Sequence, residues 1–234
     1  MLRSIKELYA DTLGALDGEI GRVKDFYFDD ATWAVRYLVA DTGAWLPGRQ
    51  VLISPYALGC PEPAGHVLRV DLTRKQIEGC PSIAEHKPVS RQYEEDYYRY
   101  YNWPFYWQGG GLWGVNLSPN KDAKSGRLPA GLDTPQAKTD DRHLRSAQAV
   151  SGYHLRTSDG TNGHVCDFMV DPKTWAIVQL TIKIGHRFSG KEVLIPASTV
   201  ARISYDESTV FVNLTNEAVE RSPERELALD NQVD

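Results

Sequence analysis

The alternation of apolar and polar residues along the chain favours short β-strands in two separate regions. Apolar positions alternate with polar ones, after one slip, in the stretch IGRVKDFYF at 20–28. Further short runs are rich in β-branched and aromatic residues: AVRYLVAD at 34–41, QVLI at 50–53 and HVLRVDL at 66–72, then AIVQLTIK at 176–183, EVLI at 192–195 and TVFVNL at 209–214. Runs of this length and spacing predict small antiparallel barrels or sandwiches.

The two regions are copies of one another. Shifting the chain by 142 residues aligns 2–81 with 144–223 without a gap, and about 25 of the 80 aligned positions are identical. We refer to these stretches as copy 1 and copy 2. An internal repeat of this size indicates two domains or two halves of one domain.

Turn and cap residues occur at equivalent places in both copies. Asp17–Gly18 and Asp159–Gly160 predict hairpin turns, because a type I′ turn needs positive φ angles that Asp and Gly tolerate. Near the end of each copy, Thr73 and Thr215 are the predicted N-caps of one short helix. A proline shortly after each helix marks its end.

Four stretches of copy 1 resemble a PRC-barrel domain: DGEIGRVKDFYFD, WAVRYLVADTG, GRQVLISPYAL and VDLTRKQIEGCP. This β-barrel module is named for the cytoplasmic domain of the photosynthetic reaction centre H subunit, and it also forms the C-terminal domain of the bacterial 16S ribosomal RNA maturation factor. The resemblance covers nearly all of both copies and implies a fold, whereas the specific roles of those two proteins are not transferred. The membrane helix of the H subunit and the N-terminal domain of the maturation factor have no counterpart in the sequence.

The predicted fold class is therefore mainly β. We expect two small antiparallel PRC-barrel-like domains, each closing with a short helix, joined by an aromatic helical segment and a flexible linker. The expected boundaries are 1–81 for the first barrel, 82–143 for the connection, 144–223 for the second barrel and 224–234 for an acidic tail. Within the connection, residues 118–141 are rich in Pro, Gly, Asp and Lys, which is typical of a flexible linker.

The connection begins with an unusually aromatic stretch, SRQYEEDYYRYYNWPFYW at 90–107. Ser90 is a plausible N-cap and Pro104 ends the predicted helix. Tyr93, Tyr97, Tyr100 and Tyr101 would form a stripe along one helix face. Three interpretations stay open: the aromatic side chains pack against the protein's own barrels, form a surface for a second subunit or another protein, or stack against a sugar or base.

The copies differ most visibly around their third turn, at 41–50 and 183–192. Asp41, Trp45 and Arg49 of copy 1 correspond to Lys183, Arg187 and Lys191 of copy 2. Equivalent loops with different charge and aromatic content indicate different contacts, although sequence drift on exposed loop tips would give the same pattern.

Composition and charge narrow the class of protein. About 41 % of residues are apolar, and the net charge of −5 leaves neither copy nor the connection basic, which disfavours non-specific binding to nucleic acid or anionic lipid. Three cysteines without a C-x-x-C pair suit a reducing compartment, although Cys60 could pair with Cys80. The sequence lacks a signal-peptide pattern and a long apolar run, so we expect a cytoplasmic protein without a membrane span.

A search for catalytic motifs finds no nucleophile elbow, phosphate loop or dinucleotide fingerprint. His164 and Cys166 would share a strand face, but two ligands are too few for a metal site. The aspartates shared by both copies, Asp25/Asp167 and Asp29/Asp171, and the tryptophans Trp33/Trp175 are expected to be structural. We therefore expect no cofactor, no metal and no catalytic residue.

The sequence thus favours a non-enzymatic scaffold that binds a protein partner or a second copy of itself, with peripheral association with a membrane complex as a variant. The candidate partner-binding residues are Tyr93, Tyr97, Tyr101, Trp103, Trp107, Trp45, Arg49 and Arg187. The alternative is a small-ligand-binding protein or enzyme with a cleft between the barrels lined by Tyr97, Tyr101, Trp103 and Trp45. RNA binding, a third alternative, would require a basic stripe on the folded surface.

Overall fold

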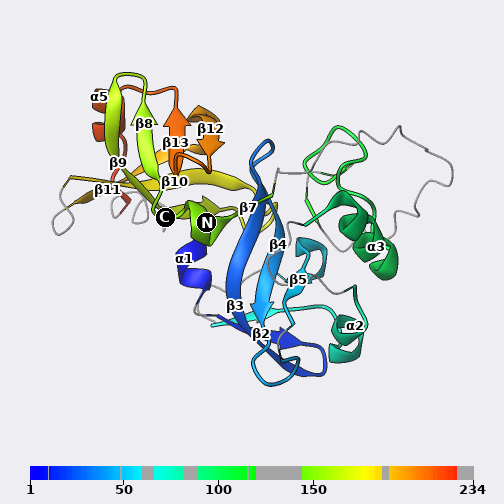
Figure 1. The fold of residues 1–234 in the computed structure, drawn as a ribbon. Coiled ribbons are helices and arrows are strands. Elements are labelled where there is room, and N and C mark those ends of the chain that lie inside the picture. The colour runs from blue at the N-terminus through cyan, green and yellow to red at the C-terminus, as the bar shows by residue number, and fades with distance from the viewer. Residues whose placement is uncertain are drawn as a thin grey trace.

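A computed structural model describes residues 1–9, 11–47, 49–59, 66–81, 89–114, 116, 118–119, 144–185 and 190–225. The protein is mainly β, with two sheets that lie side by side in Figure 1. Arg187, Cys60, most of the predicted linker and the tail beyond residue 225 lie outside the described residues. In the described part of the chain, no helix is long and apolar enough to cross a membrane.

The first sheet contains most of copy 1. Its strand order is β5-β4-β3-β2-β6, and β7 pairs with β3 in addition. The elements of copy 1 are β1 (Arg3–Ser4), α1 (Ile5–Leu8), β2 (Thr12–Ala15), β3 (Gly18–Asp29), β4 (Ala34–Asp41), β5 (Val51–Ile53), η1 (Pro55–Ala57), β6 (Val67–Arg69) and α2 (Arg74–Glu78). All pairs in this sheet are antiparallel except β2 with β6.

The second sheet repeats this arrangement in copy 2. Its order is β11-β10-β9-β8-β13-β12, with β1 paired to β9. The elements are β7 (Leu144–Ser146), α4 (Ala147–Val150), β8 (His154–Thr157), β9 (Gly160–Val170), β10 (Ile177–Ile184), β11 (Lys191–Pro196), η3 (Ala197–Thr199), β12 (Val200–Ser204), β13 (Thr209–Val212) and α5 (Asn216–Glu220). The parallel pair β13–β8 corresponds to β6–β2 of copy 1.

Each predicted hairpin turn also holds the helix that closes its copy. The Asp17 carboxylate accepts a hydrogen bond from the backbone N–H of Arg74 at 2.7 Å, at the start of α2. Asp159 does the same for Asn216 of α5, at 2.8 Å. The predicted caps are confirmed, since the hydroxyls of Thr73 and Thr215 accept N–H groups of α2 and α5. The repeated Asp therefore joins the hairpin to the helix in each copy.

The two copies exchange their first strands. Strand β1 of copy 1 pairs with β9 of copy 2, and β7 of copy 2 pairs with β3 of copy 1. The exchange is continued by backbone hydrogen bonds at the starts of β4 and β10: Val35 N–H donates to the Trp175 carbonyl at 2.8 Å, and Ile177 N–H donates to the Trp33 carbonyl at 2.7 Å. Each sheet is thus completed by the other copy.

Aromatic side chains fill the junction between the copies. Phe28 of copy 1 lies 5.5 Å from Phe168 of copy 2, measured between ring centroids. Phe28 also stacks on Trp33, and Phe26 contacts Trp175 across the junction. Trp33 and Trp175 adopt positive φ angles of 58° and 55°, which places both at the same strained turn before their strands.

The repeated aspartates of the long strands join one copy to the other. The Asp25 carboxylate accepts hydrogen bonds from the Ser146 hydroxyl at 2.5 Å and from the Gln148 N–H at 3.0 Å. Asp167 accepts the equivalent bonds from Ser4 at 2.5 Å and from the Lys6 N–H at 3.0 Å. Burial raises the pKa of Asp25 above its usual value, although these hydrogen bonds act in the opposite direction.

Candidate functional site

The site is built by residues 90–114, hereafter the aromatic segment, which pack against β4, β5 and η1 of copy 1 and appear in green in Figure 1. Its helix α3 (Arg91–Tyr101) begins and ends as the sequence predicts. The Ser90 hydroxyl accepts the Tyr93 N–H at 3.2 Å. Asn102 adopts a left-handed C-cap conformation with φ of 53°, and Pro104 follows.

The buried face of α3 is rotated from the predicted tyrosine stripe. Glu94, Tyr97 and Tyr98 are buried, with 0 to 1 % of their surface exposed. Tyr100, which the stripe included, is 45 % exposed. The four predicted tyrosines do form one row, because ring centroids lie 6.0 Å apart for Tyr93 and Tyr97, 5.0 Å for Tyr97 and Tyr101, and 4.8 Å for Tyr100 and Tyr101. The row runs from the buried side of the helix to the exposed side, while Glu94 and Tyr98 complete the core-facing side.

Two tyrosines join α3 to the edge of the sheet at β5. The Tyr97 hydroxyl donates to the Leu52 carbonyl at 2.9 Å and accepts the Ser54 N–H at 3.0 Å. The Tyr98 hydroxyl lies 3.2 Å from the Ser54 hydroxyl. Burial raises the pKa of both tyrosines, so both hydroxyls keep their protons. The Tyr97 hydroxyl therefore satisfies backbone groups that an edge strand would otherwise expose.

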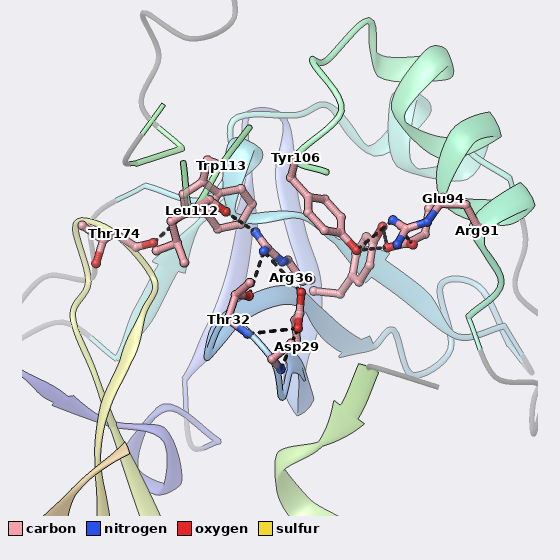
Figure 2. Close-up of polar contacts among 11 residues, drawn as sticks. Asp29, Thr32, Arg36, Arg91, Glu94, Tyr106, Leu112, Trp113 and Thr174 are labelled. Carbon is pink, nitrogen blue, oxygen red and sulfur yellow. Dashed lines mark hydrogen bonds and ion pairs between the residues drawn. The ribbon is translucent and has the colours of Figure 1, made fainter. Parts of the chain in front are cut away.

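The Glu94 carboxylate is the anionic centre of a polar cluster beneath the segment. The hydroxyls of Tyr37 and Tyr106 donate to its Oε1 atom at 2.9 and 2.8 Å, and the Arg91 guanidinium lies 2.9 Å from Oε2. Figure 2 shows these contacts converging from α3, β4 and the stretch after the helix. Burial, and secondly the nearby Glu94 charge, raise the pKa values of Tyr37 and Tyr106. These tyrosines are therefore permanent hydrogen-bond donors.

The cationic centre of the cluster is Arg36 on β4, whose side chain is only 2 % exposed. Its guanidinium donates to the Leu112 carbonyl at 2.7 Å and to the Thr32 hydroxyl at 3.0 Å, and lies 3.4 Å from the Asp29 carboxylate. It also lies 3.9 Å from the centroid of the Tyr106 ring. A buried arginine of this kind needs both its anion and its carbonyl partners, because an unpaired buried charge is costly.

The segment contacts copy 2 through Trp113. Trp113 is fully buried, and its indole N–H donates to the backbone carbonyl of Thr174 at 2.7 Å (Figure 2). Thr174 belongs to the turn between β9 and β10. The turn around Gly114 holds this tryptophan, since Gly114 has a φ of 74° and a Cβ there would come within 3 Å of two backbone oxygens. The aromatic segment thus contacts both copies.

The chemistry available to the cluster is limited by its internal pairing. The Glu94 oxygens and two of the three Arg36 nitrogens already have partners within the protein. Among the described residues, no three His, Cys, Asp or Glu side chains are grouped to hold a metal ion. An open surface depression lies elsewhere, between α2 and α3, and its lining residues are Thr73, Lys75, Gln76, Glu78, Gly79 and Tyr100.

Two of the candidate partner-binding residues lie in the core. Tyr97 and Trp103 are 0 and 4 % exposed. Trp103 stacks on Tyr101 with ring centroids 4.5 Å apart. The chain's own rings therefore occupy the space around two of the residues proposed to line an inter-barrel cleft.

The other described candidates are partly exposed. Tyr93 donates its hydroxyl hydrogen to the Pro81 carbonyl, and Trp107 stacks on Phe105. Trp45 lies under the Arg74 guanidinium, 4.7 Å from it. Arg49 donates to the carbonyls of Glu78 and Cys80 at the end of α2. Cys80 is a buried free thiol, and its predicted partner Cys60 lies outside the described residues.

Sequence reasoning missed Arg36, Tyr37 and Tyr56 as part of this site. A comparison of the two copies could have identified these residues, because the equivalent residues of copy 2 are Val178, Gln179 and Ser198, which differ in size and polarity. The list of differences thus marks where the aromatic segment packs in copy 1: Tyr56 stacks on Trp103, and Val178, at the position of buried Arg36, is 42 % exposed.

No protein-family model matches the chain, and a search of curated proteins finds no similar sequence.

Proposed function

We propose that this protein is a non-enzymatic protein-interaction scaffold of the PRC-barrel class that acts in the cytoplasm. In this proposal the two copies form one platform of fixed geometry, and their unlike outer surfaces bind a protein partner. The reciprocal contacts of Ser4 with Asp167 and of Ser146 with Asp25 support a fixed orientation between the copies.

The observation that carries the proposal is the way the aromatic segment bridges the copies. The segment is anchored on copy 1 by the buried pairs of Glu94 and Arg36, and it reaches copy 2 through the Trp113–Thr174 hydrogen bond. Buried charged groups that are used for internal pairing fit a role in positioning better than a role in proton transfer. We therefore assign the cluster to holding the platform together.

The proposed partner surface includes the half-buried candidates and leaves out the buried ones. Tyr97 and Trp103 are too deeply buried to contact a partner. Tyr101, Trp107 and Trp45 keep part of their rings accessible, and residues of this type supply large contact area at low entropy cost. The partner in this proposal is another protein or a second copy of the chain.

The test is quantitative affinity capture from native lysate with the folded protein and with two single variants. Trp113→Phe removes the indole donor to copy 2 but keeps an aromatic ring. Tyr27→Phe is the matched control, because it keeps an aromatic ring and Tyr27 is a half-buried residue of β3 outside both the aromatic segment and the proposed partner surface. Circular dichroism would first establish that both variants fold.

The proposal predicts saturable, stoichiometric capture of a defined protein by the wild type, weaker capture by Trp113→Phe and little change with Tyr27→Phe. Capture that persists after the bait has been heat-unfolded would contradict it. So would native mass spectrometry that finds a bound small molecule as the specific ligand.

A further inference from the structure

The outer face of the copy 2 sheet carries basic residues on four strands, with a phenylalanine on a fifth strand among them. Strands β12, β13, β8, β9 and β10 lie next to one another, with β12, β13 and β8 in the upper left of Figure 1. Along β8, the outward residues His154 and Arg156 alternate with buried Leu155 and Thr157. This strand therefore has one face in the core and one in solvent.

The first row across this face consists of two arginines flanking a phenylalanine. The strand register pairs Arg202 with Phe211 and Phe211 with Arg156. The Arg202 guanidinium lies 3.6 Å from the centroid of the Phe211 ring. Arg156 is exposed, the Arg202 side chain is 56 % exposed, and Phe211 is half-buried. Side chains opposite one another on adjacent strands are neighbours on the surface.

The second row extends the face toward β10 with two histidines and a lysine. The register pairs His154 with His164 and His164 with Lys183. Within the described ranges, neither Arg156 nor Lys183 has an ion-pair partner, and Arg202 is paired only with exposed Glu207 at 3.3 Å. We call these two rows the basic face, with the residues Arg156, Arg202, Phe211, His154, His164 and Lys183.

Copy 1 does not reproduce this face. At the positions of Arg156 and Lys183 it has Gly14 and Asp41. Asp41 is the register partner of Arg22, which takes the place of His164, so an acidic side chain neighbours that cation. In copy 2 the acidic neighbour, Glu192 of β11, lies at the end of the row as the register partner of Lys183. Because of these substitutions, only copy 2 has the arrangement of two arginines around a phenylalanine.

We propose that the basic face of copy 2 binds an acidic protein segment that carries an apolar side chain between its carboxylates. Arg156 and Arg202 lie on either side of Phe211, so carboxylates would pair with the arginines while the apolar side chain packs on the ring. This proposal rests on the proposed scaffold function and specifies the chemistry of the partner.

A protein segment fits this face better than a nucleic acid does. The chain carries a net charge of −5, which repels an extended polyanion beyond the few cations of the face. Nucleic-acid surfaces continue their positive charge along a groove, whereas here Glu207 lies beside Arg202 at the end of the row. A short acidic segment needs only the cations that are present.

The probe is a fluorescent synthetic peptide in which glutamates flank leucine residues, with a glutamine-for-glutamate peptide as its neutral counterpart. Fluorescence anisotropy measures its binding to the full chain at several salt concentrations. The test variant is Arg156→Gln/Lys183→Gln/Arg202→Gln. The matched control, Arg22→Gln/Lys24→Gln/Arg69→Gln, removes three cations from copy 1 and leaves the basic face intact.

We expect saturable binding of the acidic peptide that weakens with salt, at least about tenfold weaker binding by the test variant, and a change of no more than roughly twofold in the control. No saturable binding, equal losses in both variants, or equal binding of the neutral peptide would overturn the proposal. If a single-stranded oligonucleotide binds the wild type more tightly than the acidic peptide does, and the test variant loses this binding, the face is a nucleic-acid site instead.

The same test variant separates this proposal from the scaffold function. If the test variant still captures the defined partner from lysate, and the acidic peptide does not bind the wild type, the basic face is excluded while the scaffold function stands. If no defined protein is captured by the wild type but the peptide binds as expected, the scaffold function fails and the acidic-ligand site remains.

Discussion

The buried carboxylate of Glu94 is the residue on which the packing of the aromatic segment depends most. It accepts hydrogen bonds from two tyrosine hydroxyls and pairs with Arg91, while its side chain is only 1 % exposed. A buried charge is stable only when its partners are in place, and removing one partner leaves the others unsatisfied. We therefore expect few substitutions at position 94 to preserve stability, even though the residue is polar.

We predict that Glu94→Gln lowers the free energy of unfolding by about 1 to 3 kcal/mol, because an amide N–H₂ group replaces an acceptor that faces Arg91. Urea denaturation measures the loss. Glu95→Gln is the matched control on the next residue: its Arg99 partner is 61 % exposed, and an exposed pair of this kind contributes less than about 1 kcal/mol. Equal losses in the two variants would mean that the buried cluster does not hold the segment.

A second prediction concerns the pH dependence caused by Asp25. Because burial raises its pKa in the folded state above 3.8, its stabilising contribution is present in full below that value and is lost as the pH rises through the folded pKa. The difference in unfolding free energy between the wild type and Asp25→Asn should therefore shrink as the pH rises from acidic to neutral. Denaturant titrations across this range measure it, with Asp206→Asn, at an exposed turn, as the control for removing a carboxylate. A difference that grows with pH would contradict the account.

At the scale of secondary-structure elements, the exchanged strands explain part of the repeat. Ser4 and Ser146 open the first helices of the two copies, and each also donates to the aspartate of the other copy. The sequence marks Ser and Asp as repeated but cannot tell whether a residue contacts its own copy or the other one. The hairpins and closing helices were predictable because their caps are local, whereas the exchange depends on contacts more than 100 residues apart.

We predict that Ser4→Ala costs more stability than the loss of a cap alone. The Ser4 hydroxyl accepts the Glu7 N–H as a cap and donates to buried Asp167, so both interactions disappear together. Thr215→Ala is the control, because its hydroxyl caps α5 within its own copy. Urea denaturation should give a loss of about 1 kcal/mol for Thr215→Ala and a larger one for Ser4→Ala. Losses of equal size would argue against a stabilising contact between the copies.

The placement of the aromatic segment was only partly predictable at this scale. Its helix and caps follow from local signals at Ser90 and Pro104, and packing against the protein's own barrels was one of three interpretations. Which copy it covers depends on Tyr37 and Tyr56, whose counterparts in copy 2 are small or polar. Long-range packing of this kind follows from complementary surfaces, which a single stretch of sequence does not specify.

At the scale of the whole molecule, the exchanged strands and the bridging segment make the two copies depend on each other. Each sheet contains a strand from the other copy, and Phe28 and Phe168 meet at the junction. We therefore expect the copies to unfold together as one cooperative unit instead of as two independent domains. The proposed platform requires this cooperativity, because independent copies could not hold their surfaces in a fixed relation.

The most direct test is native-state hydrogen exchange with mass spectrometry on Leu155→Ala. Leu155 is fully buried in copy 2, far along the chain from copy 1, and its truncation should cost about 2 to 5 kcal/mol. The account predicts that peptides from β4 in copy 1 lose as much protection as peptides from β10 in copy 2. Loss of protection confined to copy 2, with β4 unchanged, would show that the copies are independent and would contradict the central claim.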